Sequence, residues 1–413
     1  MSRNLTKDVT SSSAAGIATG AAASRMDRRL VWLLAIACCI SVANLYYSQP
    51  ILADIGRNFH MSVSETGFIA TLGQLGYASG LLFIVPLGDR YNRRTLIVCM
   101  LVAVTLALIA MAIAPNAVFL AIASYAVGVT TVVPQLIIPF AASMAGDHER
   151  GQVIGTVMSG LLIGILLART ASGFISAHLG WQAVYWIAAA MMVALAVVMR
   201  FALPADRPRS SMSYPRLLHS LWQLARREPV LRETSVIGGL VFGAFSAFWV
   251  VLAFFLETPP YHYGSDVAGL FGLVGVAGAL AASFVGRLAD KMDSRRTTGI
   301  AVGVVVVSFA LFWLTGHYLW GLIIGVILLD LGMQSIQVSN QTRVYSLNPH
   351  ERNRLNSVYM VSYFIGGSLG SLLGSYGWSI AGWTGVCAVG GILLVAALGI
   401  YAVNSRRKAI ANV

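Results

Sequence analysis

Charged residues are scarce in this sequence. Asp, Glu, Lys and Arg make up only 11% of the 413 residues, whereas 57% are hydrophobic, a balance that excludes an ordinary soluble globular protein. A membrane-spanning helix needs about 20 predominantly apolar residues. Such stretches recur along the chain and predict an all-α membrane protein with twelve transmembrane helices, over residues 30–52, 65–87, 95–114, 117–144, 153–177, 181–203, 234–256, 267–286, 298–315, 319–342, 354–375 and 379–403.

Cysteine is also rare, and the four cysteines all fall inside expected spans. There they behave as small apolar side chains, so the sequence implies neither a disulfide framework nor a metal site. The chain contains no Gly-x-x-x-x-Gly-Lys-Ser/Thr phosphate loop, which argues against an enzyme or pump driven by nucleotide hydrolysis. No cofactor is expected. Residues 1–29 lack the apolar core of a signal peptide and are expected to form a disordered cytoplasmic tail.

The formal net charge of +12 has two possible meanings, a nucleic-acid partner or a membrane topology signal. If the N-terminus is cytoplasmic, every Lys and Arg except Arg57 and Arg169 falls on the cytoplasmic side of the expected helices. This asymmetry is the positive-inside signature, and it predicts that both termini are cytoplasmic. We therefore expect no nucleic-acid partner.

The two halves of the chain share landmarks at a nearly constant spacing, which indicates internal duplication. An Asp followed by basic residues occurs at Asp89 and at Asp290, 201 positions apart; His148-Glu149-Arg150 recurs as His350-Glu351-Arg352 after 202 positions, and Gly180-Trp181 as Gly377-Trp378 after 197. The predicted organisation is a tail (1–29), a six-helix bundle (30–203), a cytoplasmic linker (204–232), a second six-helix bundle (233–404) and a short cytoplasmic tail (405–413).

Two six-helix halves related by parallel duplication are the organisation of major facilitator superfamily transporters, and this chain resembles that superfamily. The loops after the second and eighth helices resemble its motif Gly-x-Leu-Ala-Asp-basic-x-Gly-basic-basic, with Val85 and Asn92 in place of the two glycines of the first copy. The resemblance implies that two halves rock against each other and that these loops act as a latch. The implied gating residues are Gly88, Asp89, Arg90, Arg93, Arg94, Gly286, Asp290, Lys291, Arg295 and Arg296.

Short segments narrow the resemblance. Residues 44–50 (Asn-Leu-Tyr-Tyr-Ser-Gln-Pro) and 166–173 (Leu-Leu-Ala-Arg-Thr-Ala-Ser-Gly) are similar to bacterial exporters of arabinose and purine nucleosides. Gly155, Gly164 and Gly173 have the spacing of the antiporter motif of such exporters, although Ala168-Arg169 stands where that motif has Gly-Pro. The resemblance implies a monomer in the lipid of a bacterial inner membrane that uses the proton motive force to export a small organic compound.

An ionisable residue in the middle of a membrane span is a functional candidate, because a charge there costs ~2.5–3.5 kcal/mol on insertion scales. Asp330 lies near the centre of the tenth expected helix, and Gln334, Gln337 and Gln341 follow on the same helical face. This stripe predicts a cavity wall, with Asp330 as a proton carrier or a counter-charge for the substrate. The alternative is hydrogen bonding between helices that only holds the bundle together.

Arg169 lies deep in the fifth expected helix and keeps its charge at physiological pH. Asp330 is the one acid near the centre of an expected helix, so charge balance predicts a switchable pair between Arg169 and Asp330. The alternative is an Arg169 side chain that extends to the outer interface. Further polar and aromatic residues are expected around the same cavity: Asn44, Tyr47, Gln49, Gln74, Tyr77, Gln135 and Trp249.

Amide and aromatic groups suit a neutral or weakly charged organic solute, such as a drug-like molecule, a sugar or a nucleoside-like metabolite. Two other functions stay open at this point. The same fold could work as a proton-coupled symporter for uptake, because the sequence does not show the direction of coupling. A membrane sensor without transport is the third possibility, although the longest polar segments are too short for a soluble signalling domain.

Overall fold

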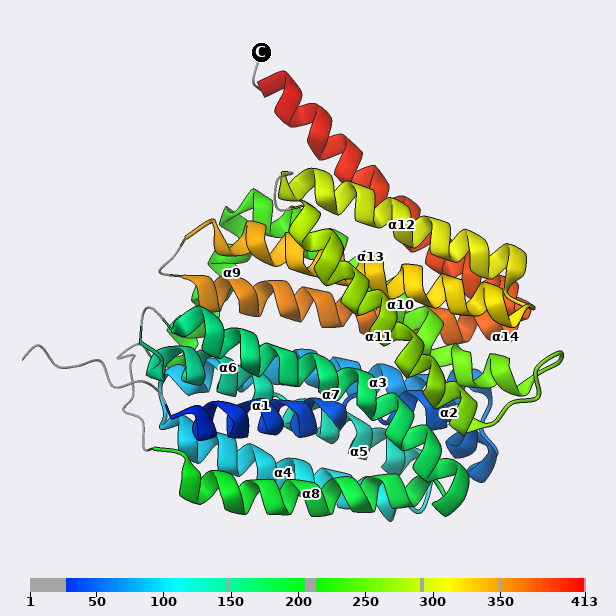
Figure 1. Ribbon diagram of the computed structural model, residues 1–413, viewed down its shortest axis with the longest axis horizontal. Helices are drawn as coiled ribbons and strands as arrows, with labels where there is room; N and C mark the ends of the chain where they lie inside the picture. The colour runs from blue at the N-terminus through cyan, green and yellow to red at the C-terminus, as the bar shows by residue number, and fades with distance from the viewer. Residues whose placement is uncertain (1–26, 147–148, 205–212, 290–292, 349–350, 412–413) are drawn as a thin grey trace, which may run out of the picture.

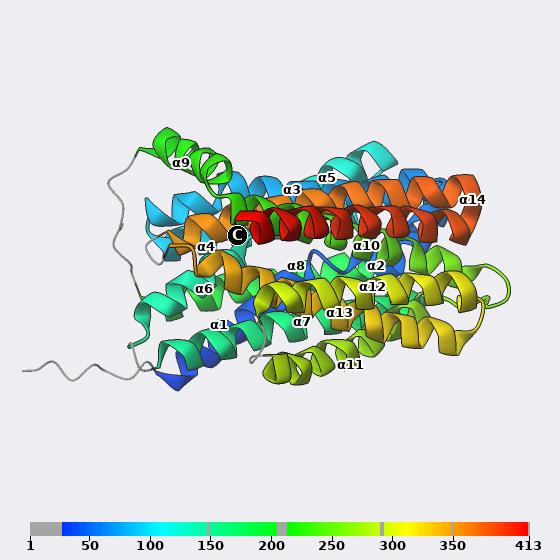
Figure 2. The same cartoon turned by 90° about the horizontal axis from the view of Figure 1, so that it is seen from above.

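The protein is a bundle of helices in two halves that pack side by side, and most helices run roughly along the long axis of the bundle (Figures 1 and 2). The computed structural model describes residues 27–146, 149–204, 213–289, 293–348 and 351–411, and every regular element in those ranges is a helix. The N-terminal half contains α1 (Arg28–Ala43), α2 (Ser48–Asn58), α3 (Val63–Phe83), η1 (Val85–Asp89), α4 (Arg93–Ala112), α5 (Ala117–Thr130), α6 (Val133–Met144), α7 (Arg150–Leu179) and α8 (Trp181–Ala202). After α9 (Tyr214–Arg227), the C-terminal half contains α10 (Pro229–Glu257), α11 (Ser265–Ala289), α12 (Ser294–Thr315), α13 (Leu319–Tyr345) and α14 (Arg352–Ala411).

These helices account for the expected number of membrane crossings. Ten helical segments in the described ranges are long and apolar enough to span a membrane, and α11 adds a shorter apolar run over Ser265–Gly278. One of the ten, α14, is 60 residues long and contains a break at Ala381 and Gly382, so it supplies two crossings. The prediction of an all-α membrane protein with twelve spans is therefore confirmed.

Proline explains why two crossings consist of two helices each. The proline ring removes a donor and clashes with the carbonyl four residues earlier. For Pro50 that carbonyl belongs to Tyr46, in the turn between α1 and α2, and for Pro134 it belongs to Thr130, the last residue of α5. Such breaks persist within a membrane because neighbouring helices enclose the freed backbone groups.

The break in α14 corrects one of the predicted repeat landmarks. The helix runs unbroken through Gly377-Trp378 and turns at Gly382, which has a positive φ of 56°. Gly180, between α7 and α8, has a φ of 85°, and Gly382-Trp383 follows Gly180-Trp181 by 202 positions, the same interval as the His-Glu-Arg pair. Positive φ favours glycine, so the Gly382-Trp383 turn is the true counterpart, and the identical dipeptide five positions earlier was misleading.

The two halves have separate hydrophobic cores. One core is built from N-terminal residues, and the other mainly from C-terminal residues with contributions from α2 and α3. Within the C-terminal half, α10 and α14 meet at glycines: a Cβ atom at Gly370 would lie 2.0 Å from the carbonyl oxygen of Gly243. The main contacts between the halves are those of α3 with α14 and of α7 with α11.

The expected linker contains a helix that packs on both halves. Leu217, Leu221 and Leu224 form the buried side of α9, which contacts η1 as well as α10 and α14. The Tyr214 hydroxyl donates a hydrogen bond to the carbonyl oxygen of Phe83, 2.8 Å away. We call the end of the bundle that carries α9, on the left in Figure 1, the linker face, and the other end the opposite face.

Candidate functional site

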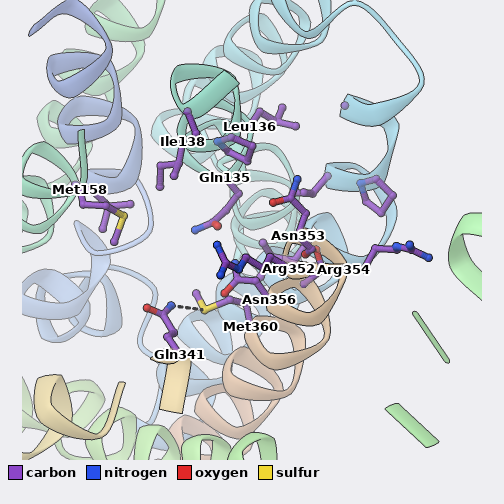
Figure 3. A pocket seen from close by; sticks show the side chains of 18 of the residues that line it. Gln135, Leu136, Ile138, Met158, Gln341, Arg352, Asn353, Arg354, Asn356 and Met360 are labelled. Carbon is purple, nitrogen blue, oxygen red and sulfur yellow. Dashed lines mark hydrogen bonds between the residues drawn. The ribbon is translucent and has the colours of Figure 1, made fainter. Parts of the chain in front are cut away.

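A cavity of about 430 Å³ lies between the two halves on the side of the linker face. Its wall extends from Arg150 and Arg352, at the beginnings of α7 and α14, inward to Tyr46 and Tyr363. Figure 3 shows Gln135 and Met158 of the N-terminal half facing Asn356 and Met360 of the C-terminal half. The volume falls within the usual range for a site that encloses a small organic molecule.

Four of the predicted cavity residues line this space: Tyr77, Gln135, Gln337 and Gln341. The Gln135 amide donates to the Tyr77 hydroxyl at 3.4 Å, and the Tyr363 hydroxyl donates to Gln337 Oε1 at 3.3 Å. The Gln341 amide lies 3.9 Å from the sulfur of Met360. The polar stripe of α13 therefore faces a cavity, as its helical spacing predicted.

A smaller cavity of about 40 Å³ lies at the inner end of the large one, and Arg169 and Asp330 both line it. The two cavities share Tyr46, Ile165 and Tyr363 as wall residues. The predicted Gln334 also lines the small cavity. Arg169 is 1% exposed and Asp330 is 4% exposed, so Arg169 does not extend to a membrane interface.

Aromatic and amide groups hold the Arg169 side chain in place. Its Nε donates to Gln49 Oε1 at 2.7 Å, and its guanidinium carbon lies 3.8 Å from the centre of the Trp249 ring. Tyr46 and Phe245 are the next nearest rings, at 5.3 and 5.7 Å. The two terminal nitrogens, Nη1 and Nη2, are buried without a hydrogen-bond partner. The guanidinium is thus held at one edge and on one face, while its other edge, formed by Nη1 and Nη2, makes no hydrogen bond.

Asp330 faces the small cavity from α13 and packs against glycines of α11. A Cβ atom at Gly275 would lie 3.0 Å from Asp330 Oδ2, so a larger residue there would fill the space beside the carboxylate. Oδ2 is buried without a hydrogen-bond partner. Arg169 and Asp330 share the cavity wall but do not form an ion pair within 4.0 Å in this conformation. Their direct pairing stays a prediction.

Five other predicted cavity residues are not part of either wall. The Asn44 amide donates to the sulfur of Met192 at 3.3 Å, and Tyr47 belongs to the N-terminal core. Gln74 donates to Ser371 Oγ at 3.0 Å and accepts from Ser246, so it joins the two halves. The last two, Gln49 and Trp249, contact Arg169 directly instead of the cavity. For Asn44, Tyr47 and Gln74 the expectation of a cavity-facing side chain is wrong in this conformation.

The two halves are closed against each other at the opposite face. Arg57 of α2 forms ion pairs with Asp54 in its own helix and with Glu257 at the end of α10. The Ser176 hydroxyl donates to the other oxygen of Asp54 at 2.5 Å, and the Thr170 hydroxyl donates to the carbonyl of Gly269 at 3.0 Å. These contacts were not predicted, because the sequence does not show which helix ends meet.

Replacing Arg57 by Gln is expected to favour opening at the opposite face, because it removes the ion pair between the halves. The pair is largely exposed, so its contribution is at most about 1 kcal/mol, or up to about fivefold in population. A cysteine introduced at Ser375 in a background without the native cysteines would be labelled faster by a polar maleimide. The matched control is Arg226→Gln on α9, which removes the same charge at the linker face; equal labelling rates in both variants would contradict the gate.

The first predicted gating loop is fastened within its own half. Arg93 forms an ion pair with Asp89 at 3.1 Å, donates to the Gly88 carbonyl at 3.0 Å and reaches the Pro139 carbonyl of α6 at 3.4 Å. The Arg94 guanidinium donates to the carbonyl of Arg200. Arg90 lies 6.0 Å from the Tyr91 ring centre. Because Asp89 and Arg93 also line the mouth of the large cavity, the loop lies where closure would occur.

The second predicted loop is described in part. Asp290 and Lys291 lie outside the described residues, as do the surroundings of Gly286. Arg296 is exposed, whereas Arg295 pairs with Glu233 of α10 at 3.4 Å. Arg343 of α13 pairs with the same Glu233 oxygen at 3.0 Å. The sequence did not single out Glu233, which stands beside the end of the expected linker.

Replacing Asp89 by Ala is expected to slow transport about fivefold, the equivalent of about 1 kcal/mol in a conformational barrier, without weakening solute binding. In this conformation Asp89 pairs inside its own half, so its predicted latch across the halves would form only when the linker face closes. Initial transport rates and equilibrium binding measured on the same preparation separate the two effects. An unchanged rate would remove the latch role.

Comparison with known proteins gives matches in sequence and in fold. The family model described as "Major Facilitator Superfamily" matches residues 34–347 and 267–412. The uncharacterized transporter YgaY of Escherichia coli O157:H7 is 41% identical over 383 residues, which cover 93% of this chain and 97% of the relative. A Helicobacter pylori protein named "Probable sugar efflux transporter" is 22% identical over 350 residues, 84% of this chain and 87% of its own. A solved structure of a bacterial homolog of the human lysosomal transporter Spinster, inward-facing and unoccupied, superposes with a TM-score of 0.72 at 15% identity, covering 92% of this chain and 97% of that one.

Proposed function

The chain belongs to the major facilitator superfamily, and from this premise we propose that it is a proton-coupled exporter of a small organic solute that works by alternating access. It is a multi-pass membrane transporter. The proposal adds a direction, a coupling ion and a class of solute. The single observation that supports it most strongly is the buried Arg169 and Asp330 at the inner end of a cavity between the two halves.

The distribution of basic residues supports an orientation with the linker face in the cytoplasm. Arg93, Arg150 and Arg352 lie at that end of the bundle around the cavity mouth, while Arg57 lies at the opposite face. By the positive-inside rule, both termini are then cytoplasmic in a bacterial inner membrane. In this orientation the protein is open to the cytoplasm and closed to the outside, the state in which an exporter loads its solute.

The charged pair supports proton coupling because its two members belong to different halves. Arg169 lies on α7 and Asp330 on α13, so any force between them acts between the two bodies that move. Protonation of Asp330 removes one charge and therefore most of the attraction, which is strong where water is excluded. A proton on Asp330 thus changes the relative stability of the inward-open and outward-open states.

The large cavity supports a neutral or weakly charged organic solute. Amide groups of Gln135, Gln337 and Gln341 are surrounded by aliphatic and aromatic side chains, a combination that orients a solute without matching a polyanion. Sugars join the candidates because one relative is named for sugar efflux. We propose that the protein works as a monomer surrounded by lipid and needs no cofactor, since the proton motive force supplies the energy.

The proposal is tested with purified protein in liposomes under an imposed pH gradient, screened against drug-like molecules, sugars, nucleosides and amino acids. If export is coupled to protons, the solute crosses the membrane in the direction opposite to that of the protons. Movement in the same direction as protons would establish uptake by symport instead. Absence of both solute and proton flux across the whole panel would favour a membrane sensor.

A further inference from the structure

We propose that the small cavity binds the amino-acid-type headgroup of a zwitterionic solute, with the carboxylate on Arg169 and the ammonium on Asp330. This inference rests on the proposed transport function and specifies its substrate class. It also assigns the two cavities different tasks, recognition of charge in the small one and accommodation of the side chain in the large one.

Arg169 is prepared for a carboxylate. Its Nε is occupied by Gln49 and its face by Trp249, so the guanidinium cannot rotate freely. The two unpartnered nitrogens, Nη1 and Nη2, belong to a side chain that is 1% exposed. Leaving such donors unpaired is costly in a buried site, and a carboxylate satisfies both at once through two parallel hydrogen bonds.

Asp330 supplies the complementary acceptor. Its Oδ2 has no hydrogen-bond partner, and the carboxylate packs closely against Gly275, whose missing side chain leaves room for it. The distance between the charged groups of Arg169 and Asp330 is too long for an ion pair, yet both line the same cavity of about 40 Å³. That space corresponds to about three water molecules, which a compact headgroup would replace.

Charge balance favours a zwitterion over an ion of either sign. The site carries one positive and one negative group, so it is neutral as a whole. A ligand with a single charge would satisfy one group and leave the other unpaired and buried, which costs several kcal/mol. A zwitterion satisfies both groups and adds no net charge to the membrane interior.

The connection between the cavities indicates what the rest of the solute looks like. Tyr46, Ile165 and Tyr363 line both spaces, so a side chain attached to the headgroup would extend past them into the large cavity. Leu161 and Phe364 are among the apolar residues on its walls. The expected solute is therefore an amino acid, or a compound with the same headgroup, that carries a bulky apolar group.

The test uses three ligands of one shape: L-phenylalanine, phenethylamine, which lacks the carboxylate, and 3-phenylpropionate, which lacks the amine. Binding to the purified full-length protein is measured by calorimetry and by the fluorescence of Trp249, against a Trp249→Phe control. We expect phenylalanine to bind at least tenfold more tightly than either analogue. Equal binding of an analogue, or no saturable binding of phenylalanine, would overturn the inference without requiring any variant to fold.

Substitutions of Arg169 and Asp330 test which side chain binds the carboxylate of the ligand and which binds its ammonium. In Arg169→Gln the advantage of phenylalanine over phenethylamine should disappear, and in Asp330→Asn its advantage over 3-phenylpropionate should disappear. Arg226→Gln on α9 should preserve both advantages, and the opposite assignment of losses would overturn the proposed orientation. These binding measurements need no proton gradient. Selective binding without proton flux would refute only the proposed coupling. Proton-coupled transport of other solutes without this selectivity would refute only the inference about the headgroup.

Discussion

Replacing Asp330 by Asn is expected to reduce proton-driven transport to the level of empty vesicles. Asparagine has nearly the same shape as aspartate but cannot bind and release a proton, so the proton can no longer alter the force between α7 and α13. Exchange of solute across the membrane at equal pH should persist at a saturating solute concentration, because that process requires rocking without net proton movement. Both processes are measured with one preparation of vesicles, first with and then without a pH gradient.

The matched control is Asp266→Asn, which removes a carboxylate in the first turn of α11 near the opposite face. That residue is half-buried and lines neither cavity, so near-normal driven transport is expected. The proposed role of Asp330 would be refuted if its Asn variant kept full proton-driven transport, or if both variants lost it to the same extent.

Replacing Arg169 by Gln is expected to destabilise the protein strongly, and adding Asp330→Asn is expected to restore much of the loss. The single change leaves the buried Asp330 without the positive charge that shares its cavity wall, and an uncompensated buried charge costs several kcal/mol. In the double variant two neutral amides face the same cavity, so that cost is absent. Thermal unfolding in detergent, followed for both single variants and the double variant, gives the interaction energy directly.

For this double-mutant cycle of Arg169→Gln and Asp330→Asn we expect an interaction energy of about 1–3 kcal/mol, which is usual for residues in one electrostatic network. Glu351→Gln provides the comparison: Glu351 pairs with Arg354 at the linker face, 3.1 Å away, and its effect should add to that of Arg169→Gln. Additive effects of Arg169→Gln and Asp330→Asn would mean that the two charges do not act as a unit. Transport should stay low in the double variant, since restoring stability does not restore a proton carrier.

The fold was largely predictable because lipid imposes one simple requirement on long segments. Each crossing must be apolar for about 20 residues and built from helix, and prolines such as Pro50 and Pro134 mark where a crossing divides into two helices. The exact position of the last turn was not predictable in the same way. Gly377-Trp378 and Gly382-Trp383 have identical letters, and only the backbone shows that Gly382 adopts the positive φ.

The site was predictable at positions where a polar or charged residue lies within an otherwise apolar span. Asp330, Arg169 and the glutamines of α13 were identified because a polar group at membrane depth must face protein or water. Pairings between distant segments were not predictable from single residues. Gln74 looked like a cavity residue but binds Ser371, 297 positions away, and Glu233, which the sequence did not single out, pairs with two arginines.

The central claim is that proton and solute movements are coupled in opposite directions, and one measurement tests it most directly. Vesicles containing the purified protein are loaded with a transported solute and a pH-sensitive dye, then diluted into solute-free buffer at the same pH. Antiport predicts that the interior becomes more acidic as the solute leaves, because each departing solute is exchanged for entering protons. A rise in internal pH, or solute release without any change in pH, would contradict the account.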